Sequence, residues 1–258
     1  MSTNEQKLSV LGHIAELRKR LIRSVIAVVI TAVLSFIFYR QIFGILIGPA
    51  PEDIVLQAIE MTEMIGTIMR VCLVSGIIVA MPYLTYELIM FVSPALTGKE
   101  KKYVYLILPW IALMFAGGVA FAYFILIPRI TGFLLTFGSD IGRDIATVTI
   151  EPRIGNYINV VTRLLLAVGL VFEMPVLTTF LARIGILKPK WLSDRRRTAF
   201  IVAFILAAII TPTIDPINQS LVAAPLIVLY ELSIWLAKLV HKKEPAVDTP
   251  ISSPESQP

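Results

Sequence analysis

Two short segments of the sequence each place one carboxylate among basic residues. Glu16 lies in HIAELRKRL, residues 13–21, and Glu100 lies in FVSPALTGKEKK, residues 91–102. Their basic neighbours are Arg18, Lys19 and Arg20 in the first segment and Lys99, Lys101 and Lys102 in the second. A carboxylate binds a guanidinium in a charge-assisted pair, and basic neighbours keep it ionised. Two such acids on one rigid frame predict a site for two arginine side chains.

Glu16 also has a purely local explanation. Arg20 follows it at i+4 and Lys19 at i+3, and such pairs stabilise a helix by about 0.2–0.5 kcal/mol. The basic residues around both acids would also attract the phosphates of interfacial lipid. The second, similar segment around Glu100 favours a binding site over local pairing.

Glu173 is the acid set most deeply in an apolar run, in VFEMPV. An ionised carboxylate in hydrocarbon is costly, so Glu173 must face the bundle, a partner or water. The structural alternative is a protonated acid bonded to a neighbouring carbonyl, such as the one freed by Pro175. Glu87 and Glu231 lie nearer the ends of their apolar runs, within reach of interfacial water.

The elements that position these acids are membrane-spanning helices. The chain has 258 residues, of which 57% are hydrophobic and 16% charged, with a mean hydropathy of +0.81. An average soluble domain is about 25% charged. With about 20 apolar residues needed for each crossing, the sequence predicts six spans, at about residues 22–39, 71–91, 104–126, 157–181, 199–210 and 221–240.

The predicted fold class is therefore an all-α integral membrane protein. The fifth span has only twelve apolar residues, which reach about 18 Å. Ahead of the first span, apolar residues recur at helical spacing, which predicts an amphipathic helix lying on the membrane surface. These residues are Leu8, Leu11, Ile14, Leu17 and Leu21.

Basic residues predict the orientation of the spans. Counted on alternate sides, 17 of the 23 lysines and arginines share the side of the N-terminus. Positive residues favour the cytoplasm, so both termini are expected there. We expect residues 1–243 to form a single six-helix domain, and the polar, proline-rich residues 244–258 to be a disordered cytoplasmic tail.

The residue types argue against an enzyme. The sequence has no CxxC, no HExxH and no glycine-rich phosphate loop, and it has one cysteine and two histidines. We therefore expect neither a metal nor a cofactor. The net charge of +5 is explained by basic residues beside spans, so it does not indicate nucleic acid as a partner.

Nearly the whole chain resembles the TatC family, the multispanning receptor of the twin-arginine protein translocase. The segments that carry the resemblance, in order, are HIAELRKRL, FVSPALTGKEKK, VGLVFEMPV, ITPTIDPINQ and APLIVLYELSIWLAKL. The resemblance implies a concave, glove-like bundle of six helices in the cytoplasmic (inner) membrane, with short fifth and sixth helices. It also implies an oligomer in the assembled complex, powered by the proton motive force.

The resemblance implies roles for single residues. Glu16 and Glu100 would hold the paired arginines of a signal peptide, at a site shaped by Arg18, Leu17, Phe91 and Pro94. Pro49 would belong to the external cap, and Glu173 would be the functional acid within the membrane. Thr211, Asp215 and Gln219 would lie where the single-span partners TatA and TatB dock.

The chain also departs from the family pattern, and other functions remain open. Thr97, Gly98 and Lys99 replace residues common before the acid, and Glu87 stands where an amide is more usual. A proton-coupled secondary transporter using Glu173 is the main alternative. A third is a membrane-embedded scaffold without a ligand, in which Glu16 and Glu100 would both be dispensable.

Overall fold

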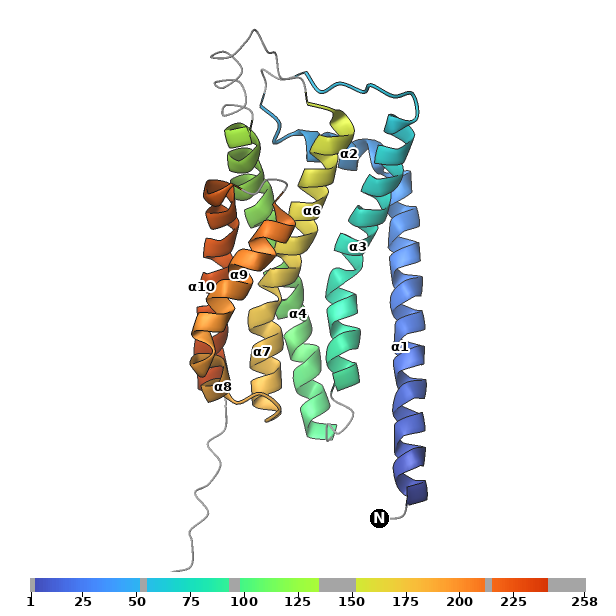
Figure 1. Ribbon diagram of the computed structural model, residues 1–258. Coiled ribbons are helices and arrows are strands. Elements are labelled where there is room, and N and C mark those ends of the chain that lie inside the picture. The colour runs from blue at the N-terminus through green and yellow to red at the C-terminus, as the bar shows by residue number, and fades with distance from the viewer. Residues whose placement is uncertain (1–2, 52–54, 93–97, 135–151, 212–214, 241–258) are drawn as a thin grey trace, which may run out of the picture.

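The computed structural model describes residues 3–51, 55–92, 98–134, 152–211 and 215–240, with side chains placed at 12–51, 55–92, 108–134, 152–211 and 215–240. Within these ranges the chain is helical apart from connections and one isolated parallel bridge, between Gln57 and Arg153 (Figure 1). The helices are α1 (Thr3–Ile37), α2 (Tyr39–Ile47), α3 (Glu63–Val92), α4 (Gly98–Phe121), the π-helix η1 (Ala122–Leu126), α6 (Ile154–Phe172), α7 (Met174–Arg183), α8 (Pro189–Asp194), α9 (Arg196–Ile210) and α10 (Pro216–Val240).

The all-helical membrane architecture predicted from the sequence is confirmed. Among the described residues, five helices are long and apolar enough to cross a membrane. The predicted fifth span corresponds to α9, whose 15 residues reach about 22 Å, less than the roughly 30 Å of a typical hydrocarbon core. The predicted sixth span is α10, which is not short: it has 25 residues, because Pro216 starts the helix five residues ahead of the apolar run.

The expectation of a separate amphipathic helix on the membrane surface is wrong. The segment continues into the first span as one 35-residue helix, α1 (Figure 1). No proline or other helix-breaking residue separates the amphipathic residues from the apolar run, so the backbone hydrogen bonds continue. Glu16 therefore lies on the same rigid element as the first span.

Other predicted boundaries also move. Helix α3 starts at Glu63, eight residues before the predicted span, and helical structure after η1 continues to Leu134. The connection between the first and second spans contains a helix, α2, which ends before the GPAPED segment, as the two prolines there require. The predicted fourth span is divided at Glu173, where α6 ends and α7 begins with Pro175 in its first turn.

The packing centre of the bundle is α6. Its residues Ile158, Val161, Leu164 and Val168 recur at helical spacing and are no more than 1% exposed. They contact residues of α3, α4, η1 and α10 in one continuous core. Lipid removes the hydrophobic driving force between helices, so close packing of this kind holds the bundle together.

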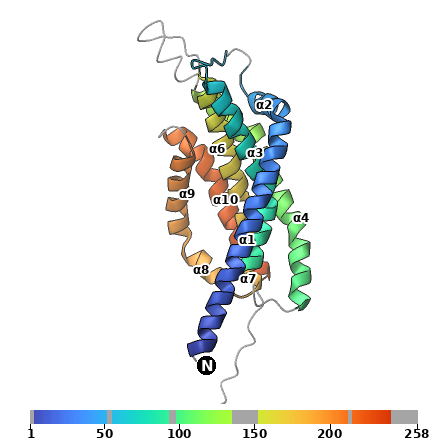
Figure 2. The ribbon, with the colours of Figure 1, turned by 90° about the vertical axis from the view of Figure 1, so that its right-hand side faces the viewer.

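Helix α1 lies at the side of the bundle, along α3 and away from α9 and α10 (Figures 1 and 2). The two helices meet closely where a Cβ on Gly76 would lie 2.6 Å from the Cα of Ala32. At the same level the Thr31 hydroxyl donates a hydrogen bond to the Gly76 carbonyl, at 2.8 Å. Most of the remaining α1 surface is exposed and apolar, as a helix facing lipid requires.

Candidate functional site

One end of the bundle gathers the N-terminal part of α1, the end of α3 and the start of α4 (Figure 1). We call it the basic end, because it carries the basic residues around Glu16 and the lysines from Lys99 onward. Glu100 lies in the first turn of α4, which places it at the same end as Glu16. The described side chains include that of Glu16 but not that of Glu100, and Pro94 lies outside the described residues.

The central contact of the basic end is Arg20, which bridges two carboxylates. Its Nε and Nη2 atoms donate hydrogen bonds to Oε1 of Glu16, at 3.0 and 2.6 Å. Its Nη1 atom donates to Oε2 of Glu87 on α3, at 2.8 Å. The local Glu16–Arg20 pair expected from i+4 spacing therefore exists, but it belongs to a network that joins α1 to α3.

Glu87 is the buried member of this network. Its side chain is 5% exposed, against 16% for Arg20 and 34% for Glu16. The Tyr83 hydroxyl donates to its Oε1 at 2.8 Å, and Arg23 lies 4.0 Å from the same atom. Both oxygens of Glu87 are thus engaged, whereas Glu16 keeps part of its carboxylate open to solvent.

The other predicted residues of the basic end surround this network. Leu17 and Arg18 are exposed on α1. Phe91, near the end of α3, stacks on His13 with ring centroids 4.6 Å apart, which adds a second contact between α1 and α3. The structure therefore brings Glu16, Phe91 and the start of α4 to one end, with Leu17 and Arg18 available to a ligand.

Glu173 lies at the break between α6 and α7 and is fully buried. The Thr85 hydroxyl of α3 donates a hydrogen bond to its Oε2, so the partner is a hydroxyl and not a carbonyl. Among the described residues its Oε1 has no hydrogen-bond partner. The side chain faces the interior of the bundle, as an acid in a membrane-spanning segment must.

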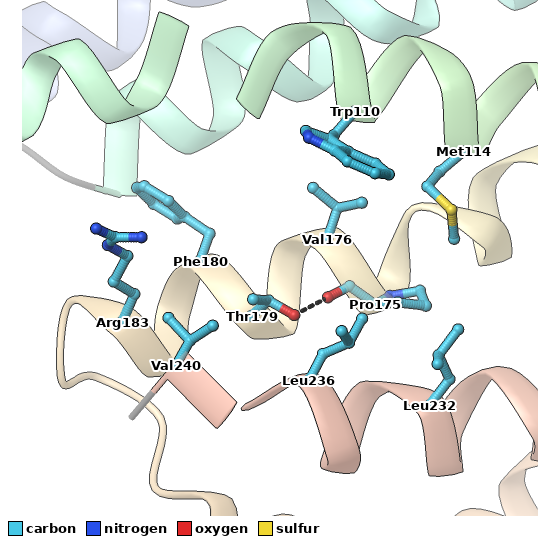
Figure 3. Close-up of a pocket in the computed structure, with 10 residues that line it drawn as sticks. All are labelled: Trp110, Met114, Pro175, Val176, Thr179, Phe180, Arg183, Leu232, Leu236 and Val240. Carbon is cyan, nitrogen blue, oxygen red and sulfur yellow. Dashed lines mark hydrogen bonds between the residues drawn. The ribbon is translucent and has the colours of Figure 1, made fainter. Parts of the chain in front are cut away.

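An apolar groove of about 400 Å³ lies between α4, α7 and α10 (Figure 3). It is lined by Trp110, Met114, Pro175, Val176, Thr179, Phe180, Arg183, Leu232, Leu236 and Val240. The Thr179 hydroxyl donates a hydrogen bond to the Pro175 carbonyl. The surface of the groove is therefore formed mainly by apolar side-chain atoms. Glu173 is not among the lining residues, so the groove and the buried acid are separate features.

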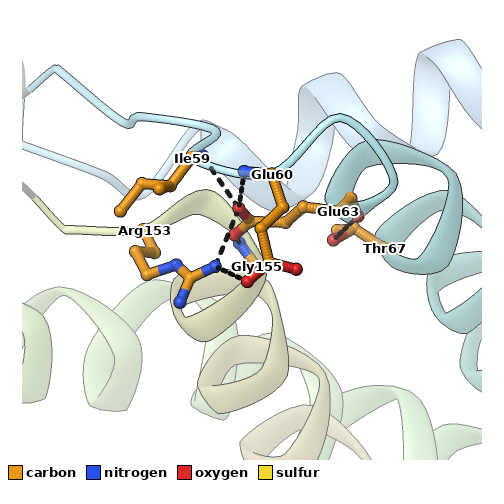
Figure 4. Close-up of polar contacts among 6 residues, drawn as sticks. All are labelled: Ile59, Glu60, Glu63, Thr67, Arg153 and Gly155. Atoms are coloured by element: carbon orange, nitrogen blue, oxygen red, sulfur yellow. Dashed lines mark hydrogen bonds and ion pairs between the residues drawn. The ribbon is translucent and has the colours of Figure 1, made fainter.

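At the opposite end, Glu63 joins the α2–α3 connection to the start of α6 (Figure 4). Its Oε2 accepts from the backbone N–H of Ile59, at 2.9 Å, and from Nη2 of Arg153, at 3.3 Å. Its Oε1 accepts from the backbone N–H of Gly155, at 3.1 Å, in the first turn of α6. Hydrogen bonds to Glu60 and Glu63 also raise the pKa of the Arg153 guanidinium. The Glu63 carboxylate therefore caps the N-terminus of α6, where the positive end of the helix dipole stabilises a negative charge.

Glu63→Ala is expected to lower the melting temperature of the purified protein more than Glu60→Ala. The first change removes the acceptor of the Ile59 and Gly155 N–H groups, whereas the second removes one exposed ion pair with Arg153. Thermal unfolding followed by tryptophan fluorescence measures both. Equal shifts for the two variants would contradict a capping role for Glu63.

The residues predicted to face partner subunits lie near the junction of α9 and α10. Gln219 donates its side-chain amide to the Phe204 carbonyl at 2.9 Å, a bond across the two helices. Asp215 accepts from the backbone N–H of Asn218 at 2.7 Å and so caps α10, and Thr211 is buried. Pro49 follows α2 at the same end, in the turn that closes that helix. The polar groups of Gln219 and Asp215 thus help to hold α9 and α10 in place.

From the sequence, Glu87 was expected only to lie within reach of interfacial water, and Tyr83 was not singled out. A signal was present, because Tyr83 and Glu87 are four residues apart and so share one face of α3. The missing information was that this face turns toward Arg20, which is 67 residues away along the chain. Within the described residues, no group of histidine, cysteine and acidic side chains is arranged to hold a metal ion.

Comparison with known proteins gives a consistent result. The family model described as Sec-independent protein translocase protein (TatC) matches residues 12–225. A protein of that name from Carboxydothermus hydrogenoformans is 37% identical over 241 residues, covering 93% of this chain and 97% of the relative. The Bacillus subtilis protein TatCy is 33% identical over 251 residues, covering 96% of each chain.

Solved structures agree with the sequence comparison. A crystal structure of the twin-arginine translocase receptor TatC superposes with a TM-score of 0.76 and 34% sequence identity, covering 88% of this chain and 99% of the other. A second, in the detergent DDM, gives 0.77 and 36%, covering 87% and 99%. The helical bundle, its order of helices and its sequence therefore place this chain in the TatC family, as a multi-pass membrane component of the Sec-independent protein translocase.

Proposed function

We propose that this chain binds the twin-arginine signal peptides of folded cargo proteins at its basic end. Glu16 and Glu100 each hold one arginine of the peptide, and Leu17, Arg18, Phe91 and Pro94 shape the surface around them. The observation that carries the proposal is the partly exposed Glu16 carboxylate, held on α1 at the same end as the first turn of α4. The chain acts as a receptor and forms no covalent bond with its cargo.

The proposal includes an orientation and partners. The basic end lies on the cytoplasmic side of the inner membrane, because lysine and arginine are concentrated there. TatA- and TatB-type subunits dock near Thr211, Asp215 and Gln219 in an oligomeric complex driven by the proton motive force. Glu173 is fully buried against Thr85, so the apolar part of a signal peptide reaches it only after α3 and α7 separate.

Crosslinking tests the receptor proposal. A synthetic signal peptide carrying a photoreactive group beside its two arginines is mixed with the purified parent, Glu16→Ala and Glu100→Ala. Each substitution is expected to reduce crosslinking about tenfold or more, because a hydrogen bond to a charged group contributes about 1.5–3 kcal/mol. A peptide with two lysines should also crosslink poorly, since lysine lacks the planar fork of arginine.

The matched control is Glu231→Ala. Glu231 is a carboxylate paired with an arginine between two helices, Arg196 at 2.9 Å, but on α10 and away from Glu16. Crosslinking at the parent level is expected for this variant. Unchanged crosslinking in both Glu16→Ala and Glu100→Ala would refute the receptor proposal. A transporter would instead require Glu173 and tolerate the loss of Glu16.

A further inference from the structure

The network around Arg20 explains why the negative charge of Glu16 is not fully neutralised by Arg20. Arg20 and Glu16 alone would form a neutral pair, with nothing left to attract a second guanidinium. Arg20 is shared, however, because its Nη1 binds Glu87 while Nε and Nη2 bind Glu16. We propose that Arg20 and Glu87 are positioning residues for Glu16: Glu87 offsets the charge of Arg20, and Arg20 fixes the Glu16 carboxylate for a peptide arginine.

The burial of the three side chains supports this division of roles. Glu87 is 5% exposed and has both oxygens engaged, by Arg20 and by Tyr83, so it anchors the network and does not bind ligand. Arg20 is 16% exposed and spans the gap between α3 and α1. Glu16 is the most exposed of the three, at 34%, and is therefore the carboxylate that a peptide can reach.

The geometry at Glu16 leaves room for a second guanidinium. Both hydrogen bonds from Arg20 end on Oε1. Among the side chains that the structure describes, none forms a hydrogen bond or ion pair with Oε2 of Glu16. A carboxylate has about four acceptor positions on its two oxygens, so Arg20 and a peptide arginine can bind Glu16 together. Arg20 therefore stays bound to Oε1 of Glu16 when the peptide binds, and it does not compete with the peptide arginine for Oε2.

The charges of the cluster give the main consequence. Glu16 and Glu87 carry two negative charges, and Arg20 and Arg23 carry two positive charges, with Arg23 4.0 Å from Glu87. These four side chains together carry no net charge before ligand binding. Without the charge of Glu87 the four would carry one net positive charge, which would weaken the attraction of Glu16 for a peptide arginine. The buried Glu87 on α3 therefore strengthens the binding of a guanidinium by Glu16 on α1, which Glu87 does not contact.

The inference rests on the receptor proposal and is tested in the same system. A fluorescein-labelled twin-arginine peptide is titrated into the full chain in lipid nanodiscs, and fluorescence anisotropy gives the dissociation constant. Glu87→Gln is expected to weaken binding about tenfold at low salt, because it leaves one uncompensated positive charge near the ligand. The loss should shrink at high salt, where charges are screened. The oxygen of the glutamine amide can still accept from Arg20, and its NH2 group can donate to the Tyr83 hydroxyl, so folding is preserved.

Two further variants separate this role from a general structural one. Glu231→Gln removes the negative charge that pairs with Arg196, and this variant should bind the peptide as the parent does. The double variant Arg20→Gln with Glu87→Gln restores neutrality and should bind more tightly than Glu87→Gln alone. Removal of the unpaired Arg20 would also relieve a folding defect, so rescue of binding counts for the electrostatic role only where the melting temperatures of both variants match that of the parent. Melting temperatures of all variants verify folding.

The outcomes distinguish the two proposals. If the parent does not bind the peptide, or if Glu16→Ala binds as the parent does, the receptor proposal fails. If the parent binds, Glu16→Ala does not, and Glu87→Gln behaves like Glu231→Gln, only the positioning role fails. Tighter binding by Glu87→Gln would also overturn the inference, because the negative charge of Glu87 would then oppose binding.

Discussion

Gly76→Ala is expected to destabilise the packing of α1 on α3, although alanine is the better helix former. A Cβ at this position would lie 2.6 Å from the Cα and N atoms of Ala32 and 2.9 Å from its Cβ. Those are mostly backbone atoms of a rigid helix, so α1 must move outward. Overpacking of this kind costs about 1–3 kcal/mol. The shift would also lengthen the bond between the Thr31 hydroxyl and the Gly76 carbonyl.

The measurement compares Gly76→Ala with Gly66→Ala on the same helix. A Cβ at Gly66 has nothing within 4 Å, so alanine there should stabilise α3 by up to about 1 kcal/mol. The melting temperatures of the two variants should therefore move in opposite directions, and hydrogen exchange should become faster in α1 of Gly76→Ala. If both variants melt above the parent, the close approach of the two helices is not required.

Glu173→Lys is expected to reduce the yield of folded protein more than any other substitution at this position. The side chain is fully buried, and its Oε2 accepts the hydrogen bond from Thr85. Lysine has no acceptor for that hydroxyl and brings a charge that costs roughly 2.5–3.5 kcal/mol at the centre of a membrane helix.

The matched substitution is Glu173→Gln, which keeps a carbonyl oxygen for Thr85 and adds no charge. It should fold at the parent level and bind a twin-arginine peptide as the parent does. Size-exclusion chromatography of detergent-solubilised protein gives the folded yield, and the nanodisc titration gives the binding. Loss of peptide binding in Glu173→Gln would show that this acid takes part in recognition as well as in packing.

The sequence predicted the helices better than it predicted their contacts. Apolar runs identify spans, so α3, α4, α6 and α10 were expected, and α9 was expected to be short, although it begins at Arg196, three residues before the predicted span. The boundaries moved because polar residues such as Glu63 and Asp215 continue or cap a helix beyond its apolar run. The run before the first span was misread because a helix in the membrane and one on its surface can share the same periodicity.

The candidate site was predictable only in part. The pair of Glu16 with Arg20 follows from i+4 spacing, which is a property of any helix. The bond from Arg20 to Glu87 joins residues 67 apart, and the bond from Thr85 to Glu173 joins residues 88 apart. Such contacts depend on how two helices are rotated toward each other. Runs that are apolar on every side contain little information about that rotation.

The position of α1 at the side of the bundle has a consequence for biosynthesis. Gly76 follows Thr31 by 45 residues, so at about 5–20 residues per second a ribosome needs about 2–9 s to supply the partner surface. During that delay the newly inserted helix is alone in lipid. It can wait there because its backbone hydrogen bonds are internal, and because the Thr31 hydroxyl can donate its one hydrogen to the Ala27 carbonyl until Gly76 arrives. The Thr31 hydroxyl therefore has an acceptor both before and after α3 packs against α1.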